Sequence, residues 1–443
     1  SYENYVTHQS FRNVMAAAVG SFKPNYFTIQ TLDGSTTVDV TNSCLFFDYF
    51  EDILSPCVTA IAQLMNSSSL FNILPIRGGE KVTISVDTAF GEFVLDDLYV
   101  YKVSNLDAQH SNEMFTLNLV SREGLTNETS RCETIYRGNL QTTVTKILKD
   151  DLKTKKYKSE NIEGTSNDYS FIGNNRKPFH VLTWLGPKAV PANGQNSGTS
   201  GEEARGTAGF LFYENKDGFN FRSIDSLVSS TKIQINSADK ENIPYYLFTQ
   251  VIEENQTKTN FNILNYNYEK NIDLMKALRV GMYVNKTYFY DLYSNTLDIY
   301  KYKVKDQVKS KLGGAESIAV SDEFGDSISR IMVRTSDRGG LKPDGSLSDK
   351  LRSGADMAMS YSRYNLLFTQ ALNMVVPCNV NLKVGGIIHA EFPRIDRSTN
   401  MTSDEEQSGY YLIKELRHHF EGGQMVTSLR LIRDSYGLYG SNK

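Results

Sequence analysis

The chain has few of the features that mark the common functional classes. It contains 10 prolines, 4 cysteines and a single tryptophan among 443 residues. No apolar stretch approaches the roughly 18 residues that a membrane-spanning helix requires, and the longest, 14–19, is short. No charged segment followed by an apolar one opens the sequence. We therefore expect neither a secretion signal nor a membrane span.

The cysteines and the charge balance argue against two further classes. Cys44, Cys57, Cys132 and Cys378 lack the spacing of metal ligands, and scattered cysteines in a chain of this size indicate buried apolar side chains in a reducing compartment. The formal net charge is −4. Because nucleic-acid binders normally carry a basic excess, we expect no tight binding of nucleic acid. A neutral or acidic wall past which DNA slides remains compatible with this composition.

Motifs for catalysis and cofactor binding are also missing. The sequence holds no P-loop, no nucleophile elbow and no glycine-rich dinucleotide fingerprint. Two acidic loops, 215–218 and 322–326, lack the ladder of ligands of a calcium site. His418 and His419 are adjacent, and on a strand their side chains would point to opposite faces, so they would not chelate one ion. We predict no catalytic, cofactor-binding or metal-binding residue, no cofactor and no enzyme activity.

What the sequence has in quantity is aromatic residues, which favour β-strands. Its 26 tyrosines and 23 phenylalanines account for nearly all of an aromatic content of 11 %. Residues 26–32 and 36–40 alternate around an Asp33-Gly34 turn, which is typical of a hairpin. Similar patterns continue through 22–122, enough for a small closed antiparallel barrel. Residues 130–154 and 264–278 instead have helical spacing, and 347–372 predicts a longer helix.

The end of the chain repeats a pattern from its first quarter. In 74–120 a Gly-Gly step precedes an apolar strand, a second strand and a closing Leu-x-Leu strand, and 384–432 has the same order. The corresponding segments are Gly78-Gly79 and Gly385-Gly386, then Gly91 to Val100 and Gly409 to His418 aligned without a gap, then 117–120 and 429–432.

Two similar β units in one chain would let a three-chain ring present six similar faces. Such a ring joins a three-fold object to a six-fold one. The alternative is that any two antiparallel meanders share patterns of this kind.

Several short motifs, taken in order, resemble the baseplate hub proteins of contractile-tailed bacteriophages. The chain looks most like the T-even type found in marine and cyanobacterial relatives. The motifs that carry the resemblance are 49–56 (YFEDILSP), 74–80 (LPIRGGE), 212–227 (FYENKDGFNFRSIDSL) and the terminal strands 410–433.

The resemblance implies a fold, an assembly and a location. The fold would be mainly β with α+β insertions, built from two tail-tube-type antiparallel β-barrel domains plus smaller inserted domains. The chain would form a homotrimeric ring with pseudo-sixfold symmetry that adapts the hexameric tail tube to the trimeric central spike. It would also contact the tape-measure protein and neighbouring baseplate proteins, and DNA would pass without sequence-specific binding. The location would be the tail baseplate of the virion, assembled in the host cytoplasm.

The resemblance, together with the patterns above, predicts the following organisation. The segments are an N-terminal arm (1–21), the first barrel (22–128), an inserted α+β domain (129–230) with a mobile loop at 190–207, the start of the second barrel (231–263), an inserted helical and strand segment (264–373), and the closing strands of the second barrel (374–443).

Two other functions stay open from the sequence alone. One is a phage-associated cell-wall hydrolase, which would need a pair of carboxylates across an aromatic-lined groove. The other is a free carbohydrate-binding β module. Tyrosines of the 282–304 region belong either to an interface, where tyrosine is enriched, or to ordinary strand core and surface. These are Tyr283, Tyr288, Tyr290, Tyr293, Tyr300 and Tyr302.

Overall fold

The computed structural model describes most of the chain. The described residues are 20–66, 74–109, 112–192, 206–228, 243–248, 261–269, 273–292, 295–304, 312, 320–336, 353–394 and 403–436. Nearly all of the predicted N-terminal arm and most of the loop 190–207 lie outside them.

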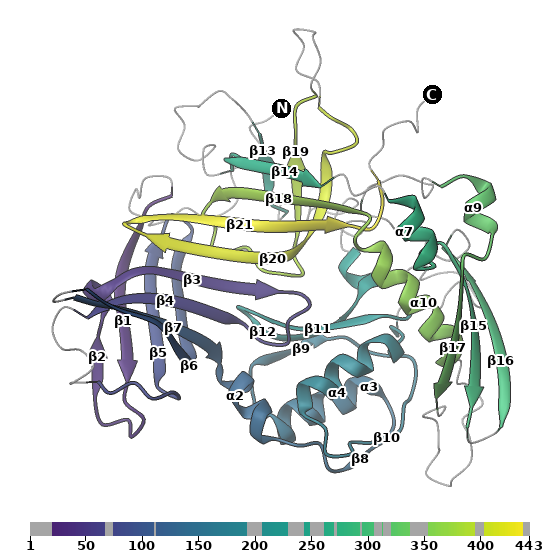
Figure 1. Ribbon diagram of the computed structural model, residues 1–443, viewed down its shortest axis with the longest axis horizontal. Coiled ribbons are helices and arrows are strands. Elements are labelled where there is room, and N and C mark those ends of the chain that lie inside the picture. The colour runs from purple at the N-terminus through teal and green to yellow at the C-terminus, as the bar shows by residue number, and fades with distance from the viewer. Residues whose placement is uncertain are drawn as a thin grey trace.

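Antiparallel pairing dominates the fold, and the largest sheet among the described residues has 13 strands (Figure 1). They are β1 (Phe22–Gln30), β2 (Thr37–Asp39), β3 (Cys44–Asp52), β4 (Thr59–Asn66), β5 (Lys81–Thr88), β6 (Gly91–Gln109), β7 (Asn112–Ser121), β13 (Tyr245–Leu247), β14 (Asn265–Glu269), β18 (Gln370–Pro377), β19 (Ile387–Glu391), β20 (Gly409–Glu421) and β21 (Gln424–Arg433). This architecture confirms the mainly β fold class.

The large sheet consists of two halves with the same strand order. The first half runs β3-β4-β7-β6-β5-β1, and the second runs β14-β18-β21-β20-β19-β13. One pairing differs, because β1 is antiparallel to β5 whereas β13 is parallel to β19. The shared order of five antiparallel strands in each half supports the internal repeat.

Backbone hydrogen bonds fix which residues of the two halves correspond. The amide of Gly79 donates to the carbonyl of Val100, and the amide of Gly385 donates to the carbonyl of Ile413. A bulge follows each acceptor, before Lys102 in β6 and before Glu415 in β20. Val100 therefore corresponds to Ile413.

The gapless alignment of Gly91 to Val100 on Gly409 to His418 is wrong by five residues. Each glycine opens its strand, but β6 runs ten residues from Gly91 to Val100, whereas β20 reaches Ile413 in five. The closing strands were aligned correctly. Leu119 lies opposite Val100 and Leu431 lies opposite Ile413.

The two halves join edge to edge within the chain. Residues 415–421 of β20 pair antiparallel with residues 46–52 of β3, without a break in the sheet. In Figure 1 the yellow β20 lies directly beside the purple β3. We call this pairing the internal junction.

An α+β unit follows the first half and packs below the large sheet in Figure 1. It comprises α2 (Arg122–Thr129), β8 (Ile135–Tyr136), α3 (Leu140–Lys146), η3 (Ile147–Asp151), β9 (Tyr157–Ile162), β10 (Phe171–Ile172), α4 (Pro178–Leu185), η4 (Gly186–Lys188), β11 (Phe210–Asn215) and β12 (Gly218–Ser223). Lys156 ties the unit to the first half through Asp97 of β6, and it also contacts Glu123 and Glu214 within the unit.

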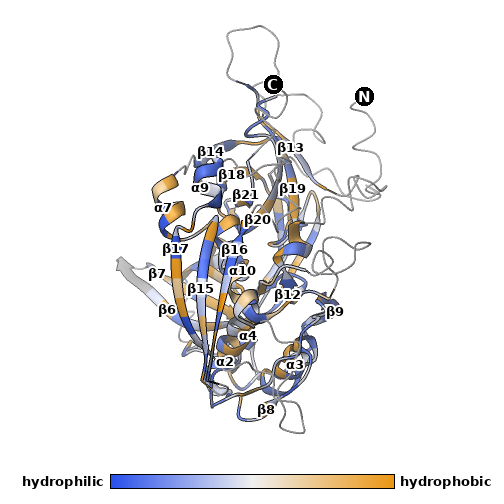
Figure 2. Cartoon of the chain, turned by 90° about the vertical axis from the view of Figure 1, so that its right-hand side faces the viewer, coloured by the Kyte–Doolittle hydropathy of each residue, from blue (hydrophilic) through white to orange (hydrophobic). Residues whose placement is uncertain are grey.

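A second, smaller sheet stands beside a helix at the other end of the molecule. Its strands β15 (Val284–Asp291), β16 (Thr296–Lys303) and β17 (Arg330–Ser336) lie at the near side of Figure 2, against α10 (Ser353–Leu366). Tyr283 and Tyr302 are buried there, whereas Tyr288 and Tyr290 are half-buried. The short helices α7 (Leu274–Arg279) and α9 (Asp322–Asp326) lie nearby.

The predicted helix over 264–278 is only partly present. Its first part is the strand β14, which pairs with β18 in the large sheet, and of its described residues only those of α7 are helical. The alternating Tyr266 and Tyr268 pack against the core, and pairing to a neighbouring strand overrides the local helical spacing. Likewise, residues 370–372 of the predicted helix 347–372 belong to β18.

We expect Gly385→Ala to destabilise the chain more than Gly79→Ala does. Both glycines have positive φ, +80° and +97°, which costs an L-residue about 1–2 kcal/mol. A Cβ on Gly385 would also overlap the hydroxyl of buried Tyr213, whereas one on Gly79 meets only the end of Leu32 at 3.1 Å. Urea unfolding measures both variants.

Adding Tyr213→Phe to Gly385→Ala should recover part of the lost stability, because it removes the overlapping hydroxyl. Equal losses for the two glycine variants, with no recovery, would contradict this account.

Candidate functional site

The internal junction gives the sheet two different faces. Along β20, His418 and Phe420 point into the core, and Arg417 and His419 point to the opposite side. His418 is 1 % exposed and stacks on the ring of Tyr49. The prediction that the two adjacent histidines lie on opposite faces is therefore confirmed. We call the side opposite the core the outer face.

The outer face is continuous across both halves of the chain. Directly opposed residues form rows that run from strand to strand. One row consists of Asn267, Asn373, Arg430, Glu415 and Asp52 on β14, β18, β21, β20 and β3. The next consists of Asn265, Val375, Ser428, Arg417 and Phe50 on the same strands. Most of these side chains are polar.

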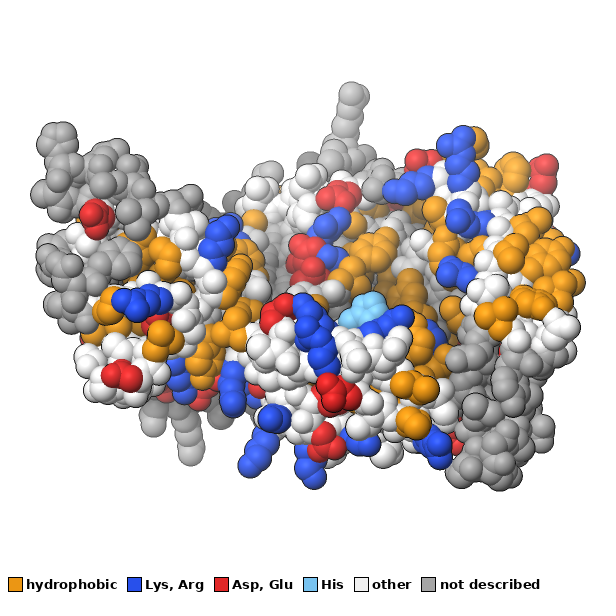
Figure 3. Space-filling view, turned by 60° about the horizontal axis from the view of Figure 1, so that its bottom comes forward, with side chains coloured by type: hydrophobic (Ala, Val, Ile, Leu, Met, Phe, Trp, Pro, Cys, Tyr) orange, Lys and Arg blue, Asp and Glu red, His pale blue; other side chains and the backbone are white. Residues whose placement is uncertain are grey.

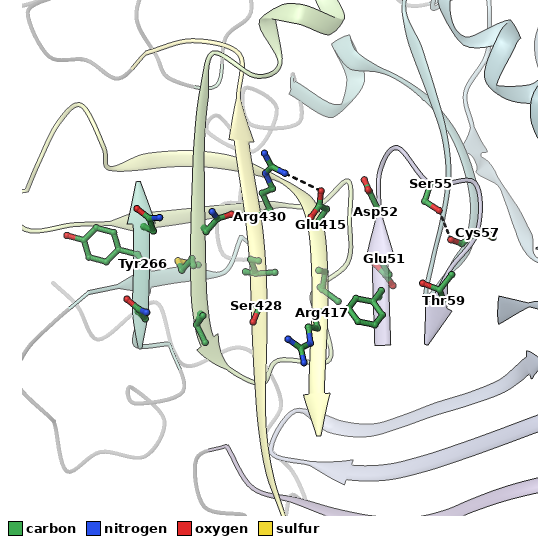
Figure 4. A pocket seen from close by; sticks show the side chains of 18 residues that line it. Glu51, Asp52, Ser55, Cys57, Thr59, Tyr266, Glu415, Arg417, Ser428 and Arg430 are labelled. Atoms are coloured by element: carbon green, nitrogen blue, oxygen red, sulfur yellow. Dashed lines mark hydrogen bonds and ion pairs between the residues drawn. The ribbon is translucent and has the colours of Figure 1, made fainter. Parts of the chain in front are cut away.

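This face is hollowed into an open groove of about 610 Å³. Figure 4 shows its lining, with Tyr266 on β14 at one end and Thr59 on β4 at the other. Arg430 and Glu415 meet in the middle of the view. Since the lining comes from six strands of both halves, the groove exists only because the halves are joined.

Near the internal junction, the described cations of the outer face take part in ion pairs. Arg417 donates two hydrogen bonds to Asp48, at 2.9 and 2.8 Å. Arg430 lies 3.6 Å from Glu415 and 3.8 Å from Glu269.

Two further side chains complete the network. Lys414 lies 3.2 Å from Asp52 and also contacts Glu415. His419 lies between Asp48, at 2.7 Å, and Glu421, at 3.1 Å.

The network carries more negative than positive charge. The network contains the cations Lys414, Arg417 and Arg430 and five carboxylates, which are Asp48, Asp52, Glu269, Glu415 and Glu421. The sum is 3 − 5 = −2 when His419 is counted as neutral. A surface of this kind does not provide the excess of free cations that binds phosphate backbones. Figure 3 looks at a different face, the bottom of the molecule in Figure 1, and there too the described acidic and basic side chains are interspersed.

Glu51 holds the junction together from the core side. This carboxylate is 2 % exposed and accepts hydrogen bonds from the Tyr49 hydroxyl and from the amides of Lys216 and Val384. These donors belong to the first half, the α+β unit and the second half. Burial raises the pKa of Glu51 to about 7, although the three hydrogen bonds oppose the shift.

The other buried ionisable groups at this site also follow from burial. Burial, with a contribution from Lys216, lowers the pKa of His418 to about 3, so the ring is neutral in the core. Burial raises the pKa of Glu214 to about 7 against the attraction of Lys156. Glu214, on β11, accepts a hydrogen bond from the amide of Val58, the residue that precedes β4.

We expect Glu51→Gln to cost about 1–3 kcal/mol of unfolding free energy at pH 5, because an amide NH₂ would face the Val384 N–H. The loss relative to the unaltered chain should shrink as pH rises. A carboxyl whose pKa rises from 4.5 to about 7 on folding contributes stability below 4.5 that disappears as pH passes 7. Urea unfolding at pH 5 and pH 8 should give losses that differ by roughly 2.5 kcal/mol, because over most of this range the folded protein holds the proton that the unfolded chain has released.

The loss is taken as the difference between the Glu51→Gln variant and the unaltered protein, because the stability contributed by His418 changes with pH in the opposite direction. Both proteins contain His418, so its contribution cancels in the difference. Glu421→Gln, at the end of β20, serves as the control and should change stability by less than about 0.5 kcal/mol. A loss for Glu51→Gln that is the same at both pH values would contradict the assignment.

Other sequence predictions about sites have mixed outcomes. Among the described residues, no group of three His, Cys, Asp or Glu side chains is arranged to hold a metal ion. No described helix is long and apolar enough to cross a membrane. All four cysteines are free, Cys132 and Cys378 buried and the other two half-buried. The absence of catalytic residues and of enzyme activity stays a prediction.

Sequence reasoning missed the buried carboxylates. Glu51 and Asp52 are adjacent carboxylates, a common pair that by itself indicates no site, but the strand sends Glu51 into the core and Asp52 to the outer face. Alternation along β3 could have indicated this. The partner amides, which come from distant segments, could not have been found in that way.

Comparison with solved structures places this fold among phage tail proteins. No protein-family model matches the chain, and no curated protein matches its sequence. The tail protein from Neisseria meningitidis MC58 aligns with a TM-score of 0.50 and 11 % identity, over 94 % of this chain and 97 % of that one. At this identity the likeness shows the fold alone, a mainly β tail-protein fold with helical insertions.

Two further solved structures are similar over most of this chain. The 43 kDa tail protein of prophage MuSo2 from Shewanella oneidensis has a TM-score of 0.48 and 8 % identity, covering 93 % of this chain and 99 % of its own. A component of the type VI secretion system of E. coli has a TM-score of 0.40 and 10 % identity, covering 94 % and 77 %. The resemblance to T-even hubs of the marine type stays a prediction.

Proposed function

We propose that the chain is the baseplate hub of a contractile phage tail. Three copies form a ring with pseudo-sixfold symmetry that adapts the hexameric tail tube to the trimeric central spike. The internal junction is the observation that carries this proposal. It joins two units of the same strand order edge to edge, as a ring of six similar units requires.

The outer face of the sheet is the proposed wall of the channel. It is concave, it crosses the junction without a break, and its charged groups are paired with a slight negative excess. DNA passing such a wall is repelled weakly and finds no row of free cations. The tape-measure protein would occupy the channel before the DNA does, and neighbouring baseplate proteins would surround the ring. The proposed location is the virion tail, with assembly in the host cytoplasm.

The proposed domain organisation follows the segments given above. The first barrel spans 22–128 and the α+β insert 129–230, and the second barrel comprises 231–263 and 374–443. The strand β14 lies in the predicted insert 264–373 but pairs within the large sheet, so we assign it to the second barrel.

The purified chain should sediment as three copies of its 49.9 kDa mass over a range of concentrations. Analytical ultracentrifugation measures this directly. A monomer at every concentration would contradict the hub and would be expected of a free carbohydrate-binding module. A two-fold dimer would contradict it as well, because a ring of six units from two-unit chains contains three chains.

The chain should not bind duplex DNA at physiological salt, whereas Glu415→Lys with Glu421→Lys should create salt-dependent binding. The two substitutions reverse the charge balance of the outer face. Fluorescence anisotropy of a labelled duplex measures both proteins.

The control carries the same charge change on the α+β unit, Glu133→Lys with Glu160→Lys, both at exposed positions. It should bind less than the outer-face variant. Strong DNA binding by the unaltered chain would contradict a passive wall.

A further inference from the structure

The internal junction pairs a strand edge of the second half with a strand edge of the first half. The matching edge in each of the two halves has no described strand beside it. The edge of β20 pairs with β3. The matching part of β6, residues 102–109, pairs with β7 on one side, and the pairing of β6 with β5 on the other side ends at Tyr99. The strand that matches β3 is β14, which is the last described strand at its end of the sheet.

The correspondence between these edges is fixed by register. Val100 matches Ile413, so Ser104 of β6 matches Arg417 of β20, each lying four residues on and after the same bulge. On the other edge, Tyr49 of β3 faces Ala60 of β4, which in turn faces Leu119 of β7. In the second half, Tyr268 of β14 faces Leu372 of β18, which in turn faces Leu431 of β21, the residue that matches Leu119. Tyr49 therefore matches Tyr268.

The sequences of the two matching edges agree with this register. Phe47-Asp48-Tyr49 of β3 corresponds to Tyr266-Asn267-Tyr268 of β14. In both strands the aromatic residues pack against the core and the polar residue between them lies on the outer face.

We propose that residues 102–109 of β6 pair antiparallel with β14 of a second copy of the chain, and so repeat the internal junction between molecules. This inference rests on the proposed ring and names the contact that closes it. Exposed strand edges are ready templates for such pairing. The contact is head-to-tail, so each copy gives one edge and receives the other, and three copies close the ring.

The internal junction predicts the intermolecular register. Arg417 faces Phe50 inside the chain, so Ser104 should face Glu269 of the next copy. A second bulge in β6, between Ser104 and Asp107, has no counterpart in β20, so Asp107 and not Leu106 matches His419. Because His419 faces Asp48, Asp107 should face Asn267. Finally, Glu421 faces Phe46, which predicts Gln109 opposite Asn265.

Charge at the outer face favours this register. Lys102 is exposed and lies two residues before Ser104, on the same face of β6. In the predicted pairing it would be a diagonal neighbour of Glu269, within reach of a long side chain. Glu269 already lies near Arg430 and accepts a hydrogen bond from Asn373. A second cation from the next copy would continue the network of ion pairs across the contact.

The test is disulfide cross-linking of the full-length chain carrying Ser104→Cys with Glu269→Cys. Directly opposed residues of antiparallel strands have Cα atoms about 4.5–5.5 Å apart, within the range of a disulfide. Mild oxidation should give covalent dimers and trimers on a denaturing gel, and a reductant should return them to monomers. Each single variant should give far less.

Two control pairs establish what a failure would mean. Phe50→Cys with Arg417→Cys reproduces the contact within one chain and should close as an internal disulfide, detected by mass spectrometry. Ser104→Cys with Asn265→Cys is out of register by four residues, about 13 Å, and should not cross-link.

The outcomes separate this inference from the proposed function. If the chain is trimeric by ultracentrifugation and the internal control closes, but Ser104→Cys with Glu269→Cys stays uncross-linked, the strand pairing is overturned and the ring stands. Cross-linking only by the out-of-register pair overturns the pairing too. A monomeric chain overturns both.

Discussion

The pairing of β20 with β3 is the contact on which the rest of the structure depends. It turns two separate antiparallel units into one sheet, and it creates the groove and the outer face that cross from one unit to the other. The core beneath it contains the stacked rings of Tyr49 and His418 and the buried carboxyl of Glu51. Because Glu51 accepts hydrogen bonds from three parts of the chain, the junction also fixes the α+β unit against the sheet.

The outer face combines a high density of charge with little free charge. The bidentate contact between Arg417 and Asp48 and the cluster around Arg430 show how this is achieved, because each cation lies across a strand from a carboxylate. Individual surface ion pairs contribute little to stability. Their larger effect here is on the electrostatic potential, which stays near neutral or slightly negative along a polar surface. A surface of this kind suits the passage of a polyanion better than its binding.

The sequence was sufficient to predict the fold class, the internal repeat and most strands, because alternation and glycine steps are local signals. The Leu-x-Leu closing strands were aligned correctly for the same reason. Local signals failed at β14, where pairing with β18 overrides helical spacing, and at β20, which is five residues shorter than β6 before the bulge. They also gave no account of Glu51, since its amide partners are 165 and 333 residues away.

The central claim is that one chain contributes two of six equivalent positions around a closed ring. Electron microscopy of the purified protein with averaging of end-on views tests it most directly. The account predicts an annulus with a central hole, six similar lobes and true three-fold symmetry. Particles without a hole, or rings whose number of lobes is not twice the number of chains, would contradict it.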